Sequence, residues 1–219
     1  MPELTVDIWS DIACPWCYIG KRRLESALAR FAHAGDVRIT WRAFELDPSA
    51  PKVSPANETQ AERLAKKYGR SLQEARAMIQ NVKDVARAEG LEFDHDRARH
   101  SNTFDGHRLI HFAQQRGLGG EMKERLLKAH HCEGEALGDV SVLVRLATEV
   151  GIDTDEVSAL LASDDLREEV RADEQMAAEL GISGVPYFVV SRRYGLSGAQ
   201  PADGMLSALE RAWGELPTS

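Results

Sequence analysis

The chain has 219 residues, of which 43% are hydrophobic and 28% charged, with a formal net charge of −8 at pH 7. This length buries a substantial core without disulfide staples, and the composition is that of a globular protein. The acidic balance and the absence of a Lys/Arg tract argue against binding to nucleic acids or anionic membranes. No apolar run approaches the ~18 residues of a membrane-spanning helix, and the N-terminus lacks the pattern of a signal peptide. We therefore expect a cytoplasmic protein.

The first fifty residues predict a β-α-β unit. Residues 4–9 are rich in β-forming side chains and read as a short buried strand. A helix is predicted to begin at Cys14 and Pro15, because proline fits the first helical turn. Residues 37–43 alternate apolar and polar side chains, which is the pattern of a second strand. Three prolines within residues 47–57 then predict a linker.

Helical patterns dominate the middle of the chain. The predicted helices cover residues 58–68, 71–89, 103–116, 120–131, 139–150, 153–162 and 165–180. Ser71 with Glu74 three residues later is a capping box, which supports the start of the second of these helices. Strand character returns at 187–191 and 194–197, and a final helix is predicted over 202–213. The order is therefore β-α-β, a helical segment, and β-β-α.

Cys14-Pro15-Trp16-Cys17 is the motif that carries chemistry. Two cysteines three positions apart at the start of a helix can close and reopen a small disulfide ring. The reactive species is the thiolate, whose formation at an ordinary pKa of ~8.5 is unfavourable at neutral pH. A helix N-terminus favours the anion by roughly 1–2 kcal/mol. We therefore expect Cys14, with a lowered pKa, to attack, and the more buried Cys17 to resolve the mixed disulfide.

Metal binding is the main alternative for these cysteines. No second C-x-x-C or histidine pair follows at the spacing of a zinc finger. His107 and His111 share one predicted helix face, and residues 130–132 form a His-His-Cys cluster, so either could ligate a metal. Surface or core histidines are nevertheless commoner, and C-x-x-C beside a β-α-β unit indicates a redox site. We expect no metal and no cofactor beyond the redox-active disulfide.

A proline stands immediately before the third predicted strand, in Gly184-Val185-Pro186-Tyr187. Proline at such a place is compatible with a cis peptide in a tight turn. From there Pro186 could lie across from the cysteine pair, beside backbone groups that pair with an extended substrate.

These features together resemble the DsbA-like thioredoxin superfamily, and within it the FrnE-type cytoplasmic dithiol–disulfide isomerases. The resemblance covers essentially the whole chain and extends to three further stretches, Ser101-Asn102-Thr103, Gly106-His107-Arg108-Leu109 and Gly198-Ala199-Gln200-Pro201. It implies an α/β, thioredoxin-like fold with a large all-helical insertion. The thioredoxin-like domain would comprise residues 1–54 and 182–219. The insertion would comprise 55–181, and its last helix could instead belong to the thioredoxin-like domain.

The resemblance also implies residue roles. Cys14 would be the nucleophile, Cys17 the resolving thiol and Pro186 the cis-proline, while Pro15 and Trp16 would tune the redox potential. An acidic residue that the superfamily places beneath the active site falls near Asp7, which would relay a proton if buried; an ordinary strand-end carboxylate is the alternative. The residues implied for substrate binding are Val185, His107 and Asn102, and for His107 a structural hydrogen bond is an equal alternative.

The remaining cysteine departs from the superfamily pattern. Cys132 occupies a position where relatives often have an aromatic residue, and we expect it to be a small buried filler. There is no second cysteine pair, which excludes a relay through one.

The predicted function is that of a thiol–disulfide oxidoreductase or isomerase. Its partners would be protein or small-molecule thiols and disulfides, with glutathione as a candidate co-substrate. In a reducing compartment the pair would rest as a dithiol, which suits reduction or isomerisation.

The main alternative is a glutathione-dependent transferase or isomerase of the kappa-class or chromene-carboxylate isomerase type. Those enzymes usually have serine near position 14 and lack the resolving cysteine. A non-catalytic chaperone is a third candidate. Substrate, direction of electron flow and oligomeric state stay open.

Overall fold

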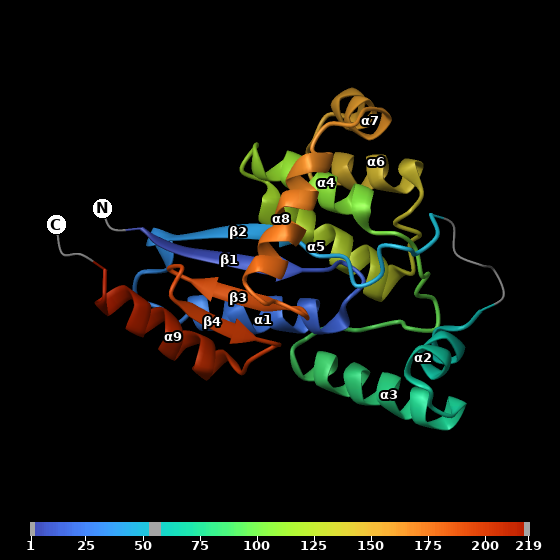
Figure 1. Cartoon of the computed structure of the whole chain (residues 1–219), viewed down its shortest axis with the longest axis horizontal. Coiled ribbons are helices and arrows are strands. Elements are labelled where there is room, and N and C mark those ends of the chain that lie inside the picture. Colours follow the sequence, from blue (N-terminus) through green and yellow to red (C-terminus); the bar gives the residue numbers. More distant parts are fainter. Residues whose placement is uncertain (1–2, 53–57, 217–219) are drawn as a thin grey trace.

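A four-stranded mixed sheet joins the two ends of the chain (Figure 1). The computed structural model describes residues 3–52 and 58–216, so part of the predicted linker, residues 53–57, lies outside it. The strands are β1 (Leu4–Ser10), β2 (Val37–Ala43), β3 (Tyr187–Val190) and β4 (Tyr194–Ser197), in the order β2-β1-β3-β4. β1 runs parallel to β2 and antiparallel to β3, and β3 and β4 form a hairpin. The predicted thioredoxin-like α/β fold is confirmed.

Helices flank this sheet and fill the segment between β2 and β3. They are α1 (Pro15–Leu28), α2 (Gln60–Tyr68), α3 (Leu72–Ala88), α4 (Phe104–Gln114), α5 (Gly119–Lys128), α6 (Val140–Glu149), α7 (Thr154–Ala162), α8 (Arg167–Glu179) and α9 (Ala202–Gly214). A short 3-10 turn, Ala34–Asp36, precedes β2. α1 packs against α9, whereas α4, α5 and α8 contact β2 (Figure 1). Each predicted helix therefore occurs, and the division into two domains stays a prediction.

The starts of α2 and α3 are fixed by their own sequences. At each start the hydroxyl of the N-cap residue accepts a hydrogen bond from the backbone N–H of the third helical residue, a glutamate. The carboxylate of that glutamate in turn accepts a hydrogen bond from the backbone N–H of the N-cap residue. The pairs are Thr59 with Glu62 and Ser71 with Glu74. Each reciprocal box satisfies two N–H groups that a helix end otherwise leaves open. The capping box predicted at Ser71 is confirmed.

The helix predicted over 120–131 ends earlier than its pattern indicates. α5 stops at Lys128, and a wider π-helical turn, Ala129–Glu133, follows. The turn closes on Gly134 (φ +71), where a Cβ would lie 2.6 Å from the Arg97 carbonyl oxygen. Only glycine fits this left-handed position against a neighbouring backbone. Both histidines of this turn, His130 and His131, are buried.

A stack of buried rings ties this turn to the start of α1. His131 lies 4.9 Å from Phe93 between ring centroids, and Phe93 lies 5.8 Å from Tyr18 of α1. His131 Nε2 is 3.0 Å from the Ile12 carbonyl oxygen, immediately before the cysteine motif. The helical segment therefore supports the loop from which α1 begins.

The outer edge of β2 is occupied by side chains of two helices. The Gln114 amide accepts from Trp41 N–H at 2.7 Å and donates to Trp41 C=O at 3.1 Å. Asp173 of α8 accepts from Ala43 N–H at 2.9 Å, and its own carbonyl accepts from the Trp9 indole at 2.9 Å. α8 is thus bound to the sheet as well as to its neighbouring helices.

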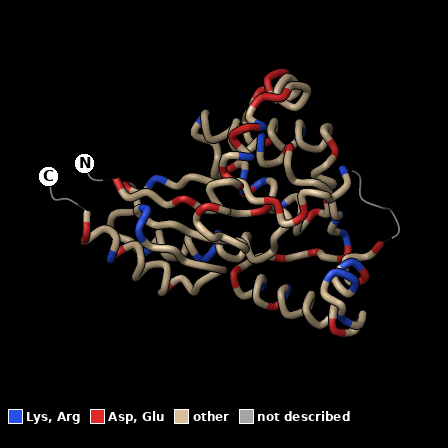
Figure 2. The backbone as a smooth tube through the Cα atoms, in the orientation of Figure 1, with Lys and Arg blue, Asp and Glu red and all other residues tan. Residues whose placement is uncertain are grey.

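Charged residues are dispersed over the chain. Figure 2 shows Lys and Arg interspersed with Asp and Glu along most elements, rather than gathered into long stretches of one sign. Within the described residues, no helix combines the length and apolar character that crossing a membrane requires.

Candidate active site

The two cysteines of the motif lie where β1 leads into α1. Cys14 is the N-cap residue of α1, with an extended backbone (φ −89, ψ 114), and Pro15 occupies the first turn. Cys17 follows one turn later, and its N–H donates to the Cys14 carbonyl at 3.0 Å. Both are free thiols and both are buried, Cys14 at 5% exposure and Cys17 at 2%. Trp16 between them is exposed.

The segment before β3 lies against Cys14. The Val185–Pro186 peptide is cis, and Cys14 Sγ is 3.5 Å from the Val185 carbonyl oxygen, within reach of an S–H donor. Gly20 of α1 makes this approach feasible: a Cβ there would lie 3.0 Å from Pro186 Cγ and 3.3 Å from Phe188. The predicted opposition of Pro186 and the cysteine pair is thus present in the geometry.

Asp11 is the buried carboxylate at this site. It accepts from the Leu46 N–H at 2.8 Å and the Ala13 N–H at 3.2 Å, and lies 3.5 Å from His107 Nε2. Burial alone would raise the pKa of Asp11, but His107 and the two N–H groups together lower it to about 2. Asp11 is therefore an anion at neutral pH.

The two thiols share one ionisation. The hydrogen bond with Cys17, followed by burial, raises the pKa of Cys14 well above its ordinary value. Burial also acts to raise the pKa of Cys17, but the bond from Cys14 and the charge of Lys123 outweigh it and lower that pKa. The helix N–H of Cys17 lowers the pKa of Cys14 as expected, but the hydrogen bond between the thiols and burial outweigh it in the dithiol. A buried cation, which the helix argument did not include, draws the charge to the inner sulfur.

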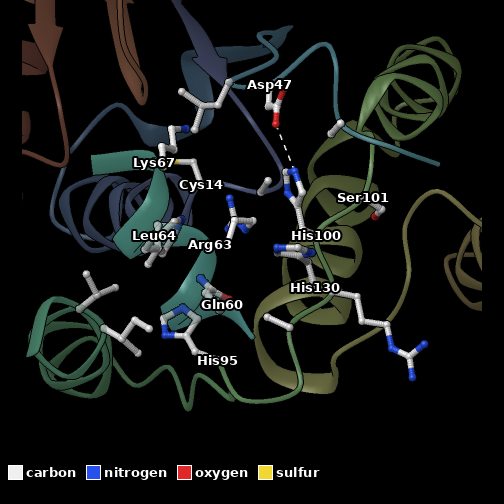
Figure 3. Close-up of a pocket in the computed structure, with 18 of the residues that line it drawn as sticks. Cys14, Asp47, Gln60, Arg63, Leu64, Lys67, His95, His100, Ser101 and His130 are labelled. Carbon is white, nitrogen blue, oxygen red and sulfur yellow. Dashed lines mark hydrogen bonds and ion pairs between the residues drawn. The ribbon is translucent and has the colours of Figure 1, made fainter. Parts of the chain in front are cut away.

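A pocket of about 670 Å³ opens beside Cys14 (Figure 3). Its walls come from the motif, α2, α3, residues 95–101 and the π-helical turn. Cys14 lines the pocket and Cys17 does not. An incoming molecule therefore meets Cys14 first. In Figure 3, Arg63 of α2 points across the pocket toward His100 and His130.

Several polar atoms in this pocket have no partner within the described part of the chain. They are Nε of Arg63, both ring nitrogens of His95 and Nδ1 of His130. Burial lowers the pKa of His95 and that of His130 to about 4, so both rings are neutral at physiological pH. A neutral imidazole both donates and accepts, and Arg63 adds a positive charge. The pocket can therefore bind a small polar molecule with a negatively charged group.

Three other residues singled out by the sequence occupy different places. Asp7 pairs with Arg42 at 2.8 Å, and the carboxylate whose charge acts on both cysteines is Asp11. Asn102 accepts from the Phe104 N–H at 2.9 Å and is not part of the pocket wall. His107 is buried behind Asp11, away from the pocket. Asn102 and His107 therefore stabilise the surrounding structure.

The histidines considered as metal ligands do not converge. Among the described residues, no group of three or more His, Cys, Asp or Glu side chains could hold a metal ion. His111 instead lies 2.8 Å from Asp173. Cys132 is only half-buried, packed beside the cluster that contains Phe93, and burial raises its pKa to about 11. It is a packing residue, although less enclosed than expected.

Sequence reasoning missed Asp11, Lys123, Arg63 and His95. Asp11 directly follows β1, at the strand end where the motif begins, so its position was a usable signal. Lys123 precedes Leu126 and Leu127 by three and four residues, which places it on the buried face of α5. Arg63 and His95 carry no comparable local signal.

Comparisons with known proteins agree with this geometry. A family model described as the DSBA-like thioredoxin domain matches residues 5–210. A crystal structure of a probable DsbA oxidoreductase, SCO1869 from Streptomyces coelicolor, is 43% identical with a TM-score of 0.91, covering 99% of this chain and 93% of that one. YwbO of Bacillus subtilis (strain 168) is 29% identical over 189 residues, 84% of this chain and 86% of that protein.

A more distant structure shares the fold alone. The cytosolic disulfide reductase DsbM from Pseudomonas aeruginosa is 19% identical with a TM-score of 0.64, covering 96% of this chain and 98% of that one. A second structure of DsbM contains GSH.

Proposed function

We propose a disulfide-exchange cycle for this chain, which belongs to the DSBA-like thioredoxin domain family and is a thiol–disulfide oxidoreductase of that family. In the reductive direction, the Cys14 thiolate attacks one sulfur of a substrate disulfide and one substrate thiolate leaves. The Cys17 thiolate then attacks Cys14, and the second substrate thiolate leaves. Two electrons pass from the cysteine pair to the substrate. The one proton and the one negative charge of the reduced pair leave with the substrate, as one thiol and one thiolate.

One observation carries this proposal: two free thiols at a helix start, of which only Cys14 lines an open pocket. The charge of the dithiol is drawn to Cys17, but the hydrogen bond between the sulfurs lets the proton move inward and expose a Cys14 thiolate. Val185 presents its carbonyl beside the reacting sulfur, which supports a role for Val185 and Pro186 in holding the substrate. We assign tuning of the potential to Pro15 and Trp16.

The direction proposed is reduction or isomerisation in the cytoplasm, as in FrnE-type enzymes. The cytosolic reductase DsbM, which shares the fold, is compatible with this assignment. We propose that an external thiol supplies the electrons that return the Cys14–Cys17 pair to its dithiol form.

Glutathione is the thiol that we propose for this purpose. The pocket beside Cys14 is within the size range of small-molecule sites. The guanidinium of Arg63, whose Nε has no partner among the described residues, fits the carboxylates of glutathione. The DsbM structure with GSH supports the same choice. An Arg63→Met variant should therefore need several-fold more glutathione for half-maximal rate. Its half-saturating insulin concentration should stay unchanged. Equal effects on both would contradict the assignment.

The cycle is tested with single serine variants assayed by glutathione-dependent reduction of insulin. Cys14→Ser should abolish turnover. Cys17→Ser should trap a mixed disulfide with substrate, visible by mass spectrometry after acid quenching. Cys132→Ser is the matched control and should retain full activity. If Cys17→Ser keeps full turnover, or if it isomerises 2-hydroxychromene-2-carboxylate with glutathione as well as the wild type does, the glutathione-dependent isomerase alternative is correct instead.

A further inference from the structure

A lysine of the helical segment reaches the interior behind the cysteine pair. Lys123 of α5 is completely buried, at 0% exposure. Its Nζ donates to the Ser10 carbonyl at 3.2 Å and lies 5.6 Å from the centre of the Trp41 ring. Ser10 ends β1, four residues before Cys14. The ammonium is thus held at the junction of β1 and the motif by an element far away in sequence.

Lys123 has no carboxylate at ion-pair distance within the described ranges, which sets it apart from its neighbours. Lys21 on α1 pairs with Glu124 at 2.6 Å, and Lys128 on α5 approaches Glu133 at 3.8 Å. An ammonium has three N–H donors, and the Ser10 carbonyl satisfies one of them. A buried cation without a counter-charge is costly, because nothing offsets its lost hydration. The compensating charge must therefore come from another kind of group.

Among the described residues, few titratable groups interact electrostatically with Lys123. They are Cys17, Cys14 and Lys21 from α1, Asp11 from the turn after β1, and His107 from α4. Lys21 repels the ammonium. Asp11 is already engaged by two backbone N–H groups and His107. The thiolate of the cysteine pair is the anion that remains.

We propose that Lys123 is the counter-ion of the thiolate in the reduced Cys14–Cys17 pair and so stabilises the dithiol against the disulfide. This inference rests on the proposed exchange function. Lys123 is a positioning residue here, acting on the charge of the inner sulfur. Its charge lowers the pKa of Cys17, while burial lowers the pKa of Lys123 to about 8. At neutral pH Lys123 is therefore mostly protonated.

The cation takes part in the cycle without changing its bonds. When Cys17 bonds to Cys14, two electrons pass to the substrate and the negative charge leaves on the substrate thiolate. Lys123 keeps its proton throughout. In the disulfide state it loses the thiolate that acts on its charge, so the oxidised protein contains a less compensated buried charge. The lysine therefore makes the pair a weaker reductant than the same pair would be without it.

The test removes the charge while keeping the volume, in Lys123→Met. The thiolate titration, followed by ultraviolet absorbance, should move up by about one pH unit. The equilibrium with a glutathione redox buffer should shift about tenfold toward the disulfide. Lys128→Met, an exposed lysine on the same helix, is the control and should change neither. The proposal would be overturned if the folded Lys123→Met protein had an acid dissociation constant and a thiol–disulfide equilibrium constant that both lay within twofold of the wild-type values.

A second measurement needs no substitution. The side-chain NMR signal of Lys123 in the wild-type protein is titrated in the dithiol and disulfide states. We expect the ammonium to lose its proton at higher pH in the dithiol, and equal midpoints would refute the counter-ion role. Neither measurement requires turnover. A wild-type protein that forms the disulfide but does not reduce insulin would contradict the proposed function and leave this inference standing.

Discussion

The buried histidines beside the pocket should make the fold sensitive to acid. His130 is almost fully enclosed by the π-helical turn and the elements around it, at 6% exposure, and its Nδ1 has no partner within the described residues. Burial lowers its pKa from an ordinary 6.5 to about 4. The unfolded chain therefore binds a proton as the pH falls through about 6.5, whereas the folded protein does not until about 4. Stability is complete above this window and decreases as the pH falls through it.

The size of the effect follows from the pKa values. One pKa unit corresponds to about 1.4 kcal/mol, so His130 alone accounts for about 3 kcal/mol between pH 7 and pH 4. Typical domains have about 5–15 kcal/mol in total, so this loss is large. Removing the imidazole in His130→Leu should make the free energy of unfolding less dependent on pH by that amount.

Urea denaturation of both proteins at several pH values measures this difference. Phe93→Leu is the matched control, because it loosens the same ring cluster without removing a titratable group. It should lower stability equally at every pH. If the wild type and His130→Leu lose the same free energy, within about 1 kcal/mol, between pH 7 and pH 4, the reasoning about His130 is wrong.

Three further substitutions test other contacts. Gly20→Ala places a Cβ 3.0 Å from Pro186 Cγ. It should lower the free energy of unfolding, measured with urea, by about 1–3 kcal/mol and should slow insulin reduction. An unaffected variant would show that the Pro186 segment can shift to accommodate the methyl group. Asp7→Asn breaks the ion pair with Arg42 and should lower the free energy of unfolding by about 1 kcal/mol. The dependence of the exchange rate on pH should stay the same, and a displaced pH profile would support a proton-relay role for Asp7. Trp9→Phe removes an indole hydrogen bond and should cost about 1 kcal/mol, and an unchanged urea midpoint would contradict this.

The parts of the fold that could be predicted are those with local signals. A few consecutive residues are enough to predict each of three elements. They are the strand with alternating side chains at 37–43, the helix that begins at the proline after Cys14, and the helix capped by Ser71. The two ends of the chain could be joined because the cysteine motif and Pro186 both have recognisable sequence contexts. The π-helical turn could not be predicted, since Gly134 at its end packs against the backbone of Arg97, a contact between segments that no local pattern indicates.

The electrostatics of the site could not be predicted in the same way. The charged residues of the site and its pocket, Asp11, Lys123 and Arg63, come from three separate segments, and only the tertiary fold brings them to one place. The helix N-terminus was the one charge effect visible locally, and at Cys14 it is outweighed by the hydrogen bond with Cys17 and by burial. The ion pair of Asp7 could not be predicted for a related reason: its partner Arg42 lies on β2, two residues beyond Thr40, which pairs with Asp7 in the sheet.

The side chains along β2 also decide how this protein meets other polypeptides. An edge strand with free N–H and C=O groups can recruit a foreign strand, which leads to aggregation or to substrates held by sheet extension. Here the Gln114 amide satisfies both backbone groups of Trp41, and Asp173 takes the Ala43 N–H. A foreign strand therefore cannot pair with the backbone at these positions. Any extended chain that approaches β2 therefore meets side chains instead of free backbone groups at Trp41 and Ala43.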